Sequence, residues 1–272
     1  MKNAKILIVP INYNTYSSLT SLINSIDESL KQCNTEISVD IHIADNSTII
    51  EDFSYHTQYI NSLKLKRNGN VGYFGGAAKV LNEIDSPQLY DFVIISNVDV
   101  KVDSTFFQNL VKQQLNEKVG WIAPQIWSHK ESRDRNPKIS QRYSKNKIGL
   151  IKLLWQFPIL HKIYVKTLYR RKSITQSFFG EGIEEIYAGH GSFIILTKAF
   201  ISRYPSIEYP IFLFGEELYL AELCRKANLS VLYNPVIKVL DTDHISTSKL
   251  KSRSFYRYNF EAIKYIINNF YE

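Results

Sequence analysis

The stretch Asp91-Phe92-Val93-Ile94-Ile95-Ser96-Asn97-Val98-Asp99-Val100 decides the fold of this chain. Its apolar run predicts a strand that is buried on both faces, as in a parallel sheet. Asp99 follows that strand, at the edge where open α/β sheets bind their ligands. A carboxylate beside the short polar side chain of Asn97 suits a hard divalent cation that carries a diphosphate. The structural alternative is a simple turn, because Asn and Asp often satisfy backbone groups in loops after strands.

The segments around this stretch alternate between strand and helix patterns. In the first half we predict strands over 5–11, 39–44, 63–66 and 91–96, and helices over 17–31 and 77–84. Such alternation indicates a parallel sheet with helical crossovers, and it brings the polar loops after the first, second and fourth strands to one edge. In the second half we predict strands over 121–127, 192–196, 230–233 and 237–240, and a helix over 218–228. A last amphipathic helix is marked by Tyr256, Phe260, Ile263, Ile267 and Phe270.

The composition is that of a globular protein. The chain has 272 residues, of which 44% are hydrophobic, and two cysteines, so a packed core is expected and a disulfide framework is not. The cysteine count fits a reducing cytosol, and no window reaches the roughly 20 apolar residues of a membrane span. We find no repeat or linker, and therefore predict one domain over 1–272.

The positive charge is concentrated in one segment. Residues 135–180 contain eleven Lys or Arg and no Asp or Glu, whereas the net charge of the whole chain is +7. Within it, 145–172 mixes cations with many large apolar side chains, as do basic amphipathic helices at anionic membrane surfaces. The alternatives are a subdomain that packs these side chains internally, and a nucleic-acid-binding surface. The rest of the chain is acidic, which argues against nucleic acid.

Seven short strings in the sequence follow the order of a known enzyme family. They are Ile11-Asn12-Tyr13-Asn14, Asp45-Asn46-Ser47, Asn70-Val71-Gly72-Tyr73-Phe74-Gly75-Gly76, Asn97-Val98-Asp99, Gly189-His190-Gly191-Ser192, Phe214-Gly215-Glu216-Glu217 and Asp243-His244. In these strings the chain resembles glycosyltransferase family 2, the inverting transferases that use sugar nucleotides. It is most similar to the bacterial rhamnosyltransferase-like members that build surface polysaccharides. The resemblance covers nearly the whole chain except 128–180.

This resemblance implies an α/β fold of the GT-A type, with a Rossmann-like, mostly parallel sheet between flanking helices. Residues 1–125 would form the half that binds the nucleotide sugar, and 126–272 the acceptor-binding half, with 135–180 as its basic amphipathic segment. The implied donor site consists of Asn14, Asp45, Asn46, Asn70, Gly75, Gly76 and Asn97. Asn14 and Asp45 would contact the base and the ribose, and the two glycines would let the backbone approach the nucleotide sugar.

The resemblance also implies the reacting groups. Asp99 and His244 would hold Mg²⁺ or Mn²⁺ against the leaving diphosphate, and Glu217 would be the general base for the acceptor hydroxyl. Two positions depart from the family pattern: Asn97 replaces the first acid of the usual Asp-x-Asp, and Glu217 stands where many relatives have Asp. The structural alternatives are that His244 is an ordinary surface or core histidine, and that Glu216 and Glu217 simply favour a helix start.

The function expected from these residues is inverting transfer of a sugar from a nucleotide-diphospho-sugar to a saccharide acceptor. The acceptor would be lipid-linked, as in O-antigen or capsule synthesis, and the protein cytoplasmic and peripheral at the inner face of the cell membrane. A nucleotidyltransferase of sugar phosphates is the alternative among enzymes. Those enzymes often have a Gly-rich loop with a basic residue after the first strand, where this chain has Asn12-Tyr13-Asn14-Thr15.

Overall fold

A computed structural model describes residues 3–172, 182–242 and 251–271 of the chain. Its strands are β1 (Ala4–Asn12), β2 (Ile37–Asp45), β3 (Ser62–Arg67), β4 (Phe92–Asn97), β5 (Val100–Val102), β6 (Val119–Ser128), β7 (Arg133–Asp134), β8 (Glu184–Ile186), β9 (Phe193–Thr197) and β10 (Ser230–Asp241). Its helices are α1 (Tyr16–Lys31), α2 (Tyr73–Leu81), the 3₁₀ turn η1 (Pro87–Leu89), α3 (Phe106–Val111), α4 (Lys145–Gln156), α5 (Pro158–Lys172), α6 (Lys198–Arg203), α7 (Glu216–Lys226) and α8 (Ser252–Phe270).

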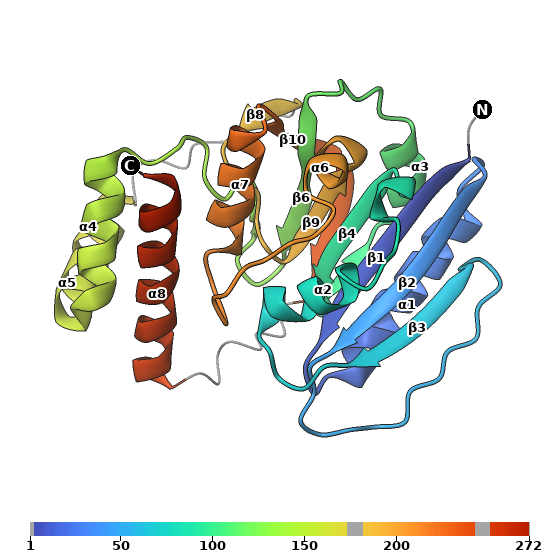
Figure 1. Cartoon of the computed structure of the whole chain (residues 1–272), viewed down its shortest axis with the longest axis horizontal. Coiled ribbons are helices and arrows are strands. Elements are labelled where there is room, and N and C mark those ends of the chain that lie inside the picture. The colour runs from blue at the N-terminus through green and yellow to red at the C-terminus, as the bar shows by residue number, and fades with distance from the viewer. Residues whose placement is uncertain (1–2, 173–181, 243–250, 272) are drawn as a thin grey trace.

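These strands form one twisted sheet in the order β3-β2-β1-β4-β9-β6-β10-β5, with β7 paired to β6 and β8 to β10 (Figure 1). The long ladders β3-β2-β1-β4 and β6-β10 are parallel, and β9 lies antiparallel between β4 and β6. The predicted fold class, an α/β fold with a mostly parallel sheet and flanking helices, is therefore confirmed.

The core lies on both faces of the sheet, because successive residues of a strand point to opposite sides. In β1, Ile6 and Ile8 pack with α1 and α3 on one face. Leu7 and Val9 belong to the cluster on the other face, which α2, α6, α7 and α8 cover. This arrangement explains why β1 is an unbroken apolar run rather than an alternating one.

Three predicted elements, one helix and two strands, differ from the structure. The helix predicted over 77–84 begins at Tyr73, so Gly75 and Gly76 lie inside α2 rather than in the loop before it. The strands predicted over 230–233 and 237–240 are one strand, β10, whose pairing with β6 shifts register between Asn234 and Lys238. An extra-residue irregularity of this kind bends a strand without ending it, which a pattern search interprets as a break.

The basic segment forms a helical layer at the end of the molecule opposite β3 (Figure 1). Helix α4 packs against α8, and α5 folds back on α4. Ile148 and Leu154 of α4 are buried. Among the residues that the structure describes, no helix is long and apolar enough to cross a membrane.

A buried ionic network ties α7 to its surroundings. Glu222 is fully buried, and its carboxylate accepts hydrogen bonds from Arg142, Tyr187 and Arg225, each at 2.7 Å. Burial alone would raise the pKa of Glu222, but these donors hold it below its usual value. The Arg142 guanidinium also donates to the carbonyl of Phe270 at 2.8 Å, so α7, β8 and the end of α8 depend on one carboxylate.

We expect Glu222→Ala to lower the free energy of unfolding by about 2–4 kcal/mol, because Arg142 and Tyr187 lose the partner that compensates their burial. Glu261→Ala is the matched control, since its pair with Arg257 is exposed and should contribute less than about 1 kcal/mol. Urea denaturation of both variants checks this. Equal losses in the two variants would show that the Glu222 network has no special role.

Candidate active site

A cleft of about 410 Å³ lies at the carboxyl ends of the parallel strands. The loops after β1, β2 and β4 line it on one side, as their polar sequences predict, and Asn46, Asn97 and Asp99 are among the lining residues. The loop before α7, the segment after β6 and Asp241 at the end of β10 line the other side. Its volume is within the usual range for small-molecule sites.

The loops after β1 and β2 are locked to each other by buried hydrogen bonds. Asp45 is 1% exposed, and its carboxylate accepts from Asn12 Nδ2, the Ser47 amide and the Tyr16 hydroxyl, the last at 2.7 Å. Asn14 has a positive φ of 56°, and its Oδ1 accepts from the amides of residues 48 and 49. Asn14 and Asp45 thus hold the two loops together.

Asn46, together with Tyr13 and Thr15 of the loop after β1, lines the cleft. Its Nδ2 donates to the carbonyl of Gly72 at 2.7 Å, and its buried Oδ1 has no hydrogen-bond partner among the described residues. A Cβ on Gly76 would lie 2.7 Å from Asn46 Nδ2, so Gly76 makes room for this side chain, while Gly75 faces Val71. An unsatisfied buried acceptor beside a cleft calls for an explanation, and a ligand donor would satisfy it.

Gly72 packs closely against the loop before α7. Its φ is 82°, and a Cβ there would lie 1.9 Å from the carbonyl oxygen of Phe212. Only glycine permits both this conformation and this approach. Asn70, two residues earlier, lines the cleft, and its Oδ1 lies 3.4 Å from the Gly72 amide.

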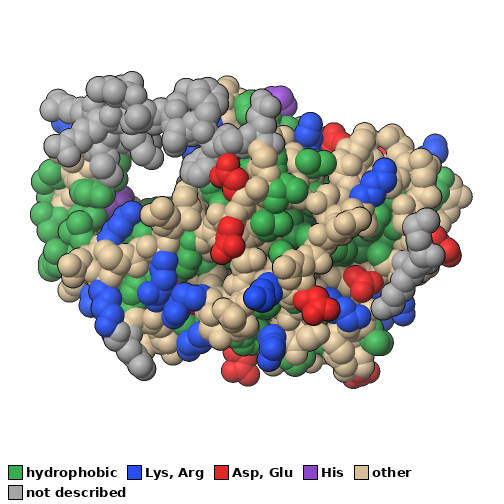
Figure 2. Space-filling view, turned by 90° about the horizontal axis from the view of Figure 1, so that it is seen from above, with side chains coloured by type: hydrophobic (Ala, Val, Ile, Leu, Met, Phe, Trp, Pro, Cys, Tyr) green, Lys and Arg blue, Asp and Glu red, His purple; other side chains and the backbone are tan. Residues whose placement is uncertain are grey.

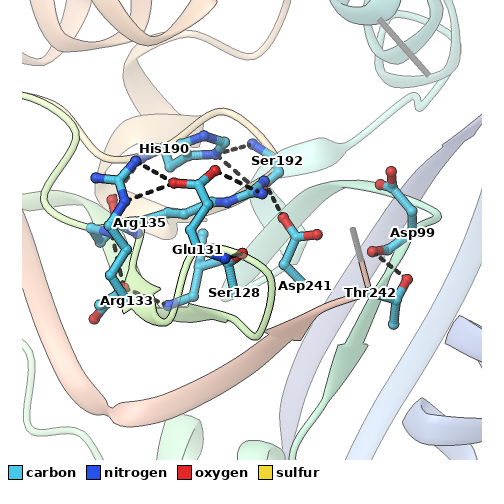
Figure 3. Close-up of polar contacts among 12 residues, drawn as sticks. Asp99, Ser128, Glu131, Arg133, Arg135, His190, Ser192, Asp241 and Thr242 are labelled. Carbon is cyan, nitrogen blue, oxygen red and sulfur yellow. Dashed lines mark hydrogen bonds and ion pairs between the residues drawn. The ribbon is translucent and has the colours of Figure 1, made fainter. Parts of the chain in front are cut away.

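The end of β4 is fixed from two sides. The Asn97 amide donates to the carbonyl of Ser192 at 2.9 Å. The carbonyl of Asp99 accepts from the amide and the hydroxyl of Thr242, at 3.0 and 2.8 Å, as Figure 3 shows. These bonds hold the Asp99 backbone while its side chain lines the cleft. His244, the second predicted metal ligand, lies outside the described residues.

Two adjacent carboxylates converge on Gly191. Glu216 and Glu217 begin α7, after Gly215 in the left-handed conformation with φ 79°. The Oε1 atoms of both glutamates lie 3.1 Å from the point where a Cβ on Gly191 would stand, and the Tyr73 hydroxyl donates to the Gly191 carbonyl at 2.7 Å. Both side chains line the cleft, although adjacent positions of a helix point about 100° apart.

The two carboxylates are electrostatically coupled. Burial, and next the charge of Glu217, raise the pKa of Glu216 to about 8, against the opposite effects of a backbone amide and Lys138. Burial and the charges of Glu216, Glu217 and Asp99 likewise raise the pKa of Tyr73 well above 10. This raised pKa favours the protonated form of Glu216, which can donate a hydrogen bond.

This raised pKa makes stability depend on pH. Between the ordinary pKa of 4.5 and about 8, the folded state keeps a proton that the unfolded state has lost, so stability falls as the pH rises. Glu216→Gln imitates the protonated acid. We expect it to match the wild type near pH 4.5 and to exceed it by on the order of 1–3 kcal/mol at pH 8.

Denaturation curves at the two pH values, without metal or nucleotide, measure this difference. Glu117→Gln is the control, because Glu117 is exposed and should give curves that follow the wild type at both pH values. A Glu216→Gln variant that is no more stable than the wild type at pH 8 would contradict the assignment.

A basic wall of the cleft is the part that the sequence did not predict. Arg135 pairs with Asp241 at the end of β10 and with Glu131 at 3.2 Å (Figure 3). Lys138 lines the same cleft. His190 lines the same wall; burial, and next the charges of Lys138, Arg135 and Arg133, lower its pKa well below 6.5. It is therefore a neutral imidazole, with Nδ1 2.9 Å from Ser192 Oγ.

Among the comparisons with known proteins, the one with solved structures supports the fold. No family model matches the chain, and no curated protein matches its sequence. Among solved structures, the glycosyltransferase TarS of S. aureus matches with a TM-score of 0.53 and 14% identity, over 98% of this chain and 40% of that chain. This chain has the GT-A-like fold. It spans less than half the length of that TarS chain.

Two further structures are similar. TarS 1–349 in complex with UDP-GlcNAc matches with a TM-score of 0.53 and 13% identity, over 98% of this chain and 67% of that chain. The catalytic domain of Drosophila β1,4-galactosyltransferase 7 in complex with xylobiose has a TM-score of 0.46 and 11% identity, over 93% of this chain and 79% of that one. The structural similarity to TarS, with a TM-score of 0.53, shows the fold. At such low sequence identity, the activity has to be argued from the residues of the site.

Proposed function

We propose that this protein is an inverting glycosyltransferase that moves a sugar from a nucleotide-diphospho-sugar to a saccharide acceptor. The observation that supports this most is that Asn46, Asp99 and Glu217 line one cleft at the carboxyl ends of the sheet. They stand there as the implied donor, metal and base residues of a GT-A enzyme. The bound UDP-GlcNAc of the TarS complex supports a nucleotide sugar as the donor class.

The donor would occupy the side of the cleft that β1, β2 and β4 form. Asn46 Oδ1 is a buried acceptor that a base or sugar donor group would satisfy. Asn70 and Asn97 add amide groups along the same side. Asn14, Asp45 and Gly76 would contribute by holding Asn46 and its loop in place.

The residues present fit a divalent metal. Mg²⁺ and Mn²⁺ bind through one or two carboxylates together with substrate phosphates, so a full protein cage is not required. Accordingly, no cluster of three or more metal-binding side chains occurs in the described residues. Asp99, with His244, would hold the ion. When bound, it would neutralise the charge that develops on the departing diphosphate.

The chain's own residues would perform the proton transfer. Glu217 would take the proton of an acceptor hydroxyl while that oxygen bonds to the anomeric carbon and the bond from this carbon to the diphosphate breaks. One displacement of this kind inverts the configuration of the anomeric carbon. Burial and the charge of Glu217 raise the pKa of Glu216, so Glu216 would add less negative charge beside the base than a second ionised carboxylate would.

The acceptor would be a lipid-linked saccharide in bacterial surface polysaccharide synthesis, and the protein would act from the cytoplasmic face of the membrane. Two alternatives are less well supported. A nucleotidyltransferase would not explain why Glu217, the proposed general base at the start of α7, lines the same cleft as Asp99. Nucleic-acid binding would leave the acidic side of the cleft without a role.

A thermal-shift panel tests the donor class. dTDP-rhamnose, UDP-galactose, UDP-galactofuranose and UDP-GlcNAc are each tested with and without Mn²⁺. A ligand at 100 times its dissociation constant adds about 2.7 kcal/mol of stability, which raises the melting midpoint measurably. We expect one donor to do so and Mn²⁺ to enlarge the shift. No shift with any of them, or with UDP or dTDP, would contradict a sugar-nucleotide site.

A further inference from the structure

Exposed apolar side chains gather on one element of this protein, the hairpin of α4 and α5. Of the fourteen large hydrophobic side chains exposed in the described part of the chain, seven lie between residues 150 and 164. They are Leu150, Leu153, Phe157, Ile159, Leu160, Ile163 and Tyr164. Single exposed apolar residues are ordinary, whereas a contiguous group marks an interaction surface.

Packing within the protein does not account for this group. The inner face of α4 packs into the core through Ile148 and Trp155, and the Trp155 ring contacts Phe255 of α8 at 5.5 Å between centroids. His161, near the start of α5, stacks on Trp155 at 4.4 Å. These side chains of the basic segment therefore pack internally. The exposed side chains on the outer face of the hairpin do not, and they need another explanation.

Cations surround the apolar group. Lys145, Lys147, Lys152, Lys162 and Lys166 lie on the two helices, and 135–180 contains no acidic residue. In Figure 2, hydrophobic side chains gather at the left end of the molecule, where α4 and α5 lie, with Lys and Arg side chains close by. Exposed aliphatic groups together with lysines match the acyl boundary and the anionic headgroups of a bilayer. An RNA or DNA partner would use the lysines and leave the isoleucines and leucines in water.

We propose that the outer face of the α4–α5 hairpin is the surface by which this protein binds an anionic lipid bilayer. This inference rests on the proposed function, because a lipid-linked acceptor is presented at such a surface. The hairpin is also connected to the cleft. Phe255 of α8, which contacts Trp155, packs edge-on against Phe214 at 5.3 Å, and Phe214 belongs to the loop that begins α7. A series of aromatic contacts, from Trp155 through Phe255 to Phe214, thus connects the proposed membrane-binding hairpin to the loop before Glu217.

Vesicle co-sedimentation with a charge-matched pair of variants tests the proposal. Ile159→Glu/Ile163→Glu alters two exposed side chains of α5, and Ile49→Glu/Leu89→Glu makes the same chemical change at two exposed side chains elsewhere. We expect the wild type to bind phosphatidylcholine vesicles that contain phosphatidylglycerol, and less so at high salt. The hairpin variant should bind at least about 10-fold more weakly, and the control should stay within about twofold of the wild type.

Four outcomes would overturn the proposal: no binding of the wild type, equal binding to pure phosphatidylcholine, a hairpin variant that binds normally, or equal losses in both variants. If the wild type instead forms dimers that the hairpin variant lacks, the face joins two copies of the chain. The vesicle assay contains no sugar nucleotide. A failed donor thermal shift alongside intact vesicle binding would therefore reject the proposed activity and leave the membrane surface standing.

Discussion

We expect Glu217→Gln to lower the rate of sugar transfer by about 10²-fold or more while donor affinity stays nearly unchanged. Glutamine keeps the size of the side chain and most of its hydrogen bonding, but it cannot accept the proton of the acceptor hydroxyl. The start of α7 should survive the change, because Gly215 and the Tyr209 hydroxyl, which donates to the Phe214 carbonyl at 2.7 Å, fix it. Steady-state kinetics with a purified acceptor give kcat, and thermal shift gives donor binding.

Glu216→Gln is the matched comparison, since its carboxyl approaches the same glycine as Glu217 does. Burial and the charge of Glu217 raise the pKa of Glu216, which favours the protonated form that cannot accept a proton, so its replacement should cost less in rate than that of Glu217. If Glu216→Gln proves the more damaging of the two, the base is one residue earlier than we propose.

Asp99→Ala should have the largest effect, a loss of metal-dependent turnover on the order of 10³-fold, because a bound metal contributes several kcal/mol of charge stabilisation. The variant should fold, since the backbone of Asp99, not its side chain, bonds to Thr242. Release of nucleoside diphosphate at several Mn²⁺ concentrations measures the loss.

Asp85→Ala, an exposed carboxylate in another part of the fold, is the control and should retain full turnover. Wild-type turnover by Asp99→Ala at every Mn²⁺ concentration would show that the metal, if one is used, is held elsewhere.

The strands and helices of the first half could be predicted because their signals are local. The apolar runs in β1 and β4 are buried on both faces, and the alternation of strand and helix leaves few possible topologies. The sequence pattern predicts that this helix begins at residue 77, whereas α2 begins at Tyr73. The difference arises because two glycines, which disfavour helices, occur in its first turn. They are tolerated there because one of them makes room for Asn46.

The candidate site was predictable where short polar strings follow strands, and not where its geometry depends on distant residues. Arg135 pairs with Asp241, which lies more than a hundred residues further along the chain, and no local sequence pattern predicts that pairing. The roles of Asn14 and Asp45 show the same limit. Their positions after β1 and β2 are evident from the sequence, whereas only the structure reveals that their side chains bond to each other's loops.

Phosphorus NMR of the purified protein with Mg²⁺ and the same panel of nucleotide sugars distinguishes a glycosyltransferase from a nucleotidyltransferase. We expect one of these donors to release its nucleoside diphosphate, slowly by hydrolysis and faster with a suitable saccharide acceptor, and we expect EDTA to stop the release. Glycosyl transfer would be contradicted if every nucleotide sugar stayed intact while a nucleoside triphosphate and a sugar phosphate were converted to pyrophosphate and a nucleotide sugar.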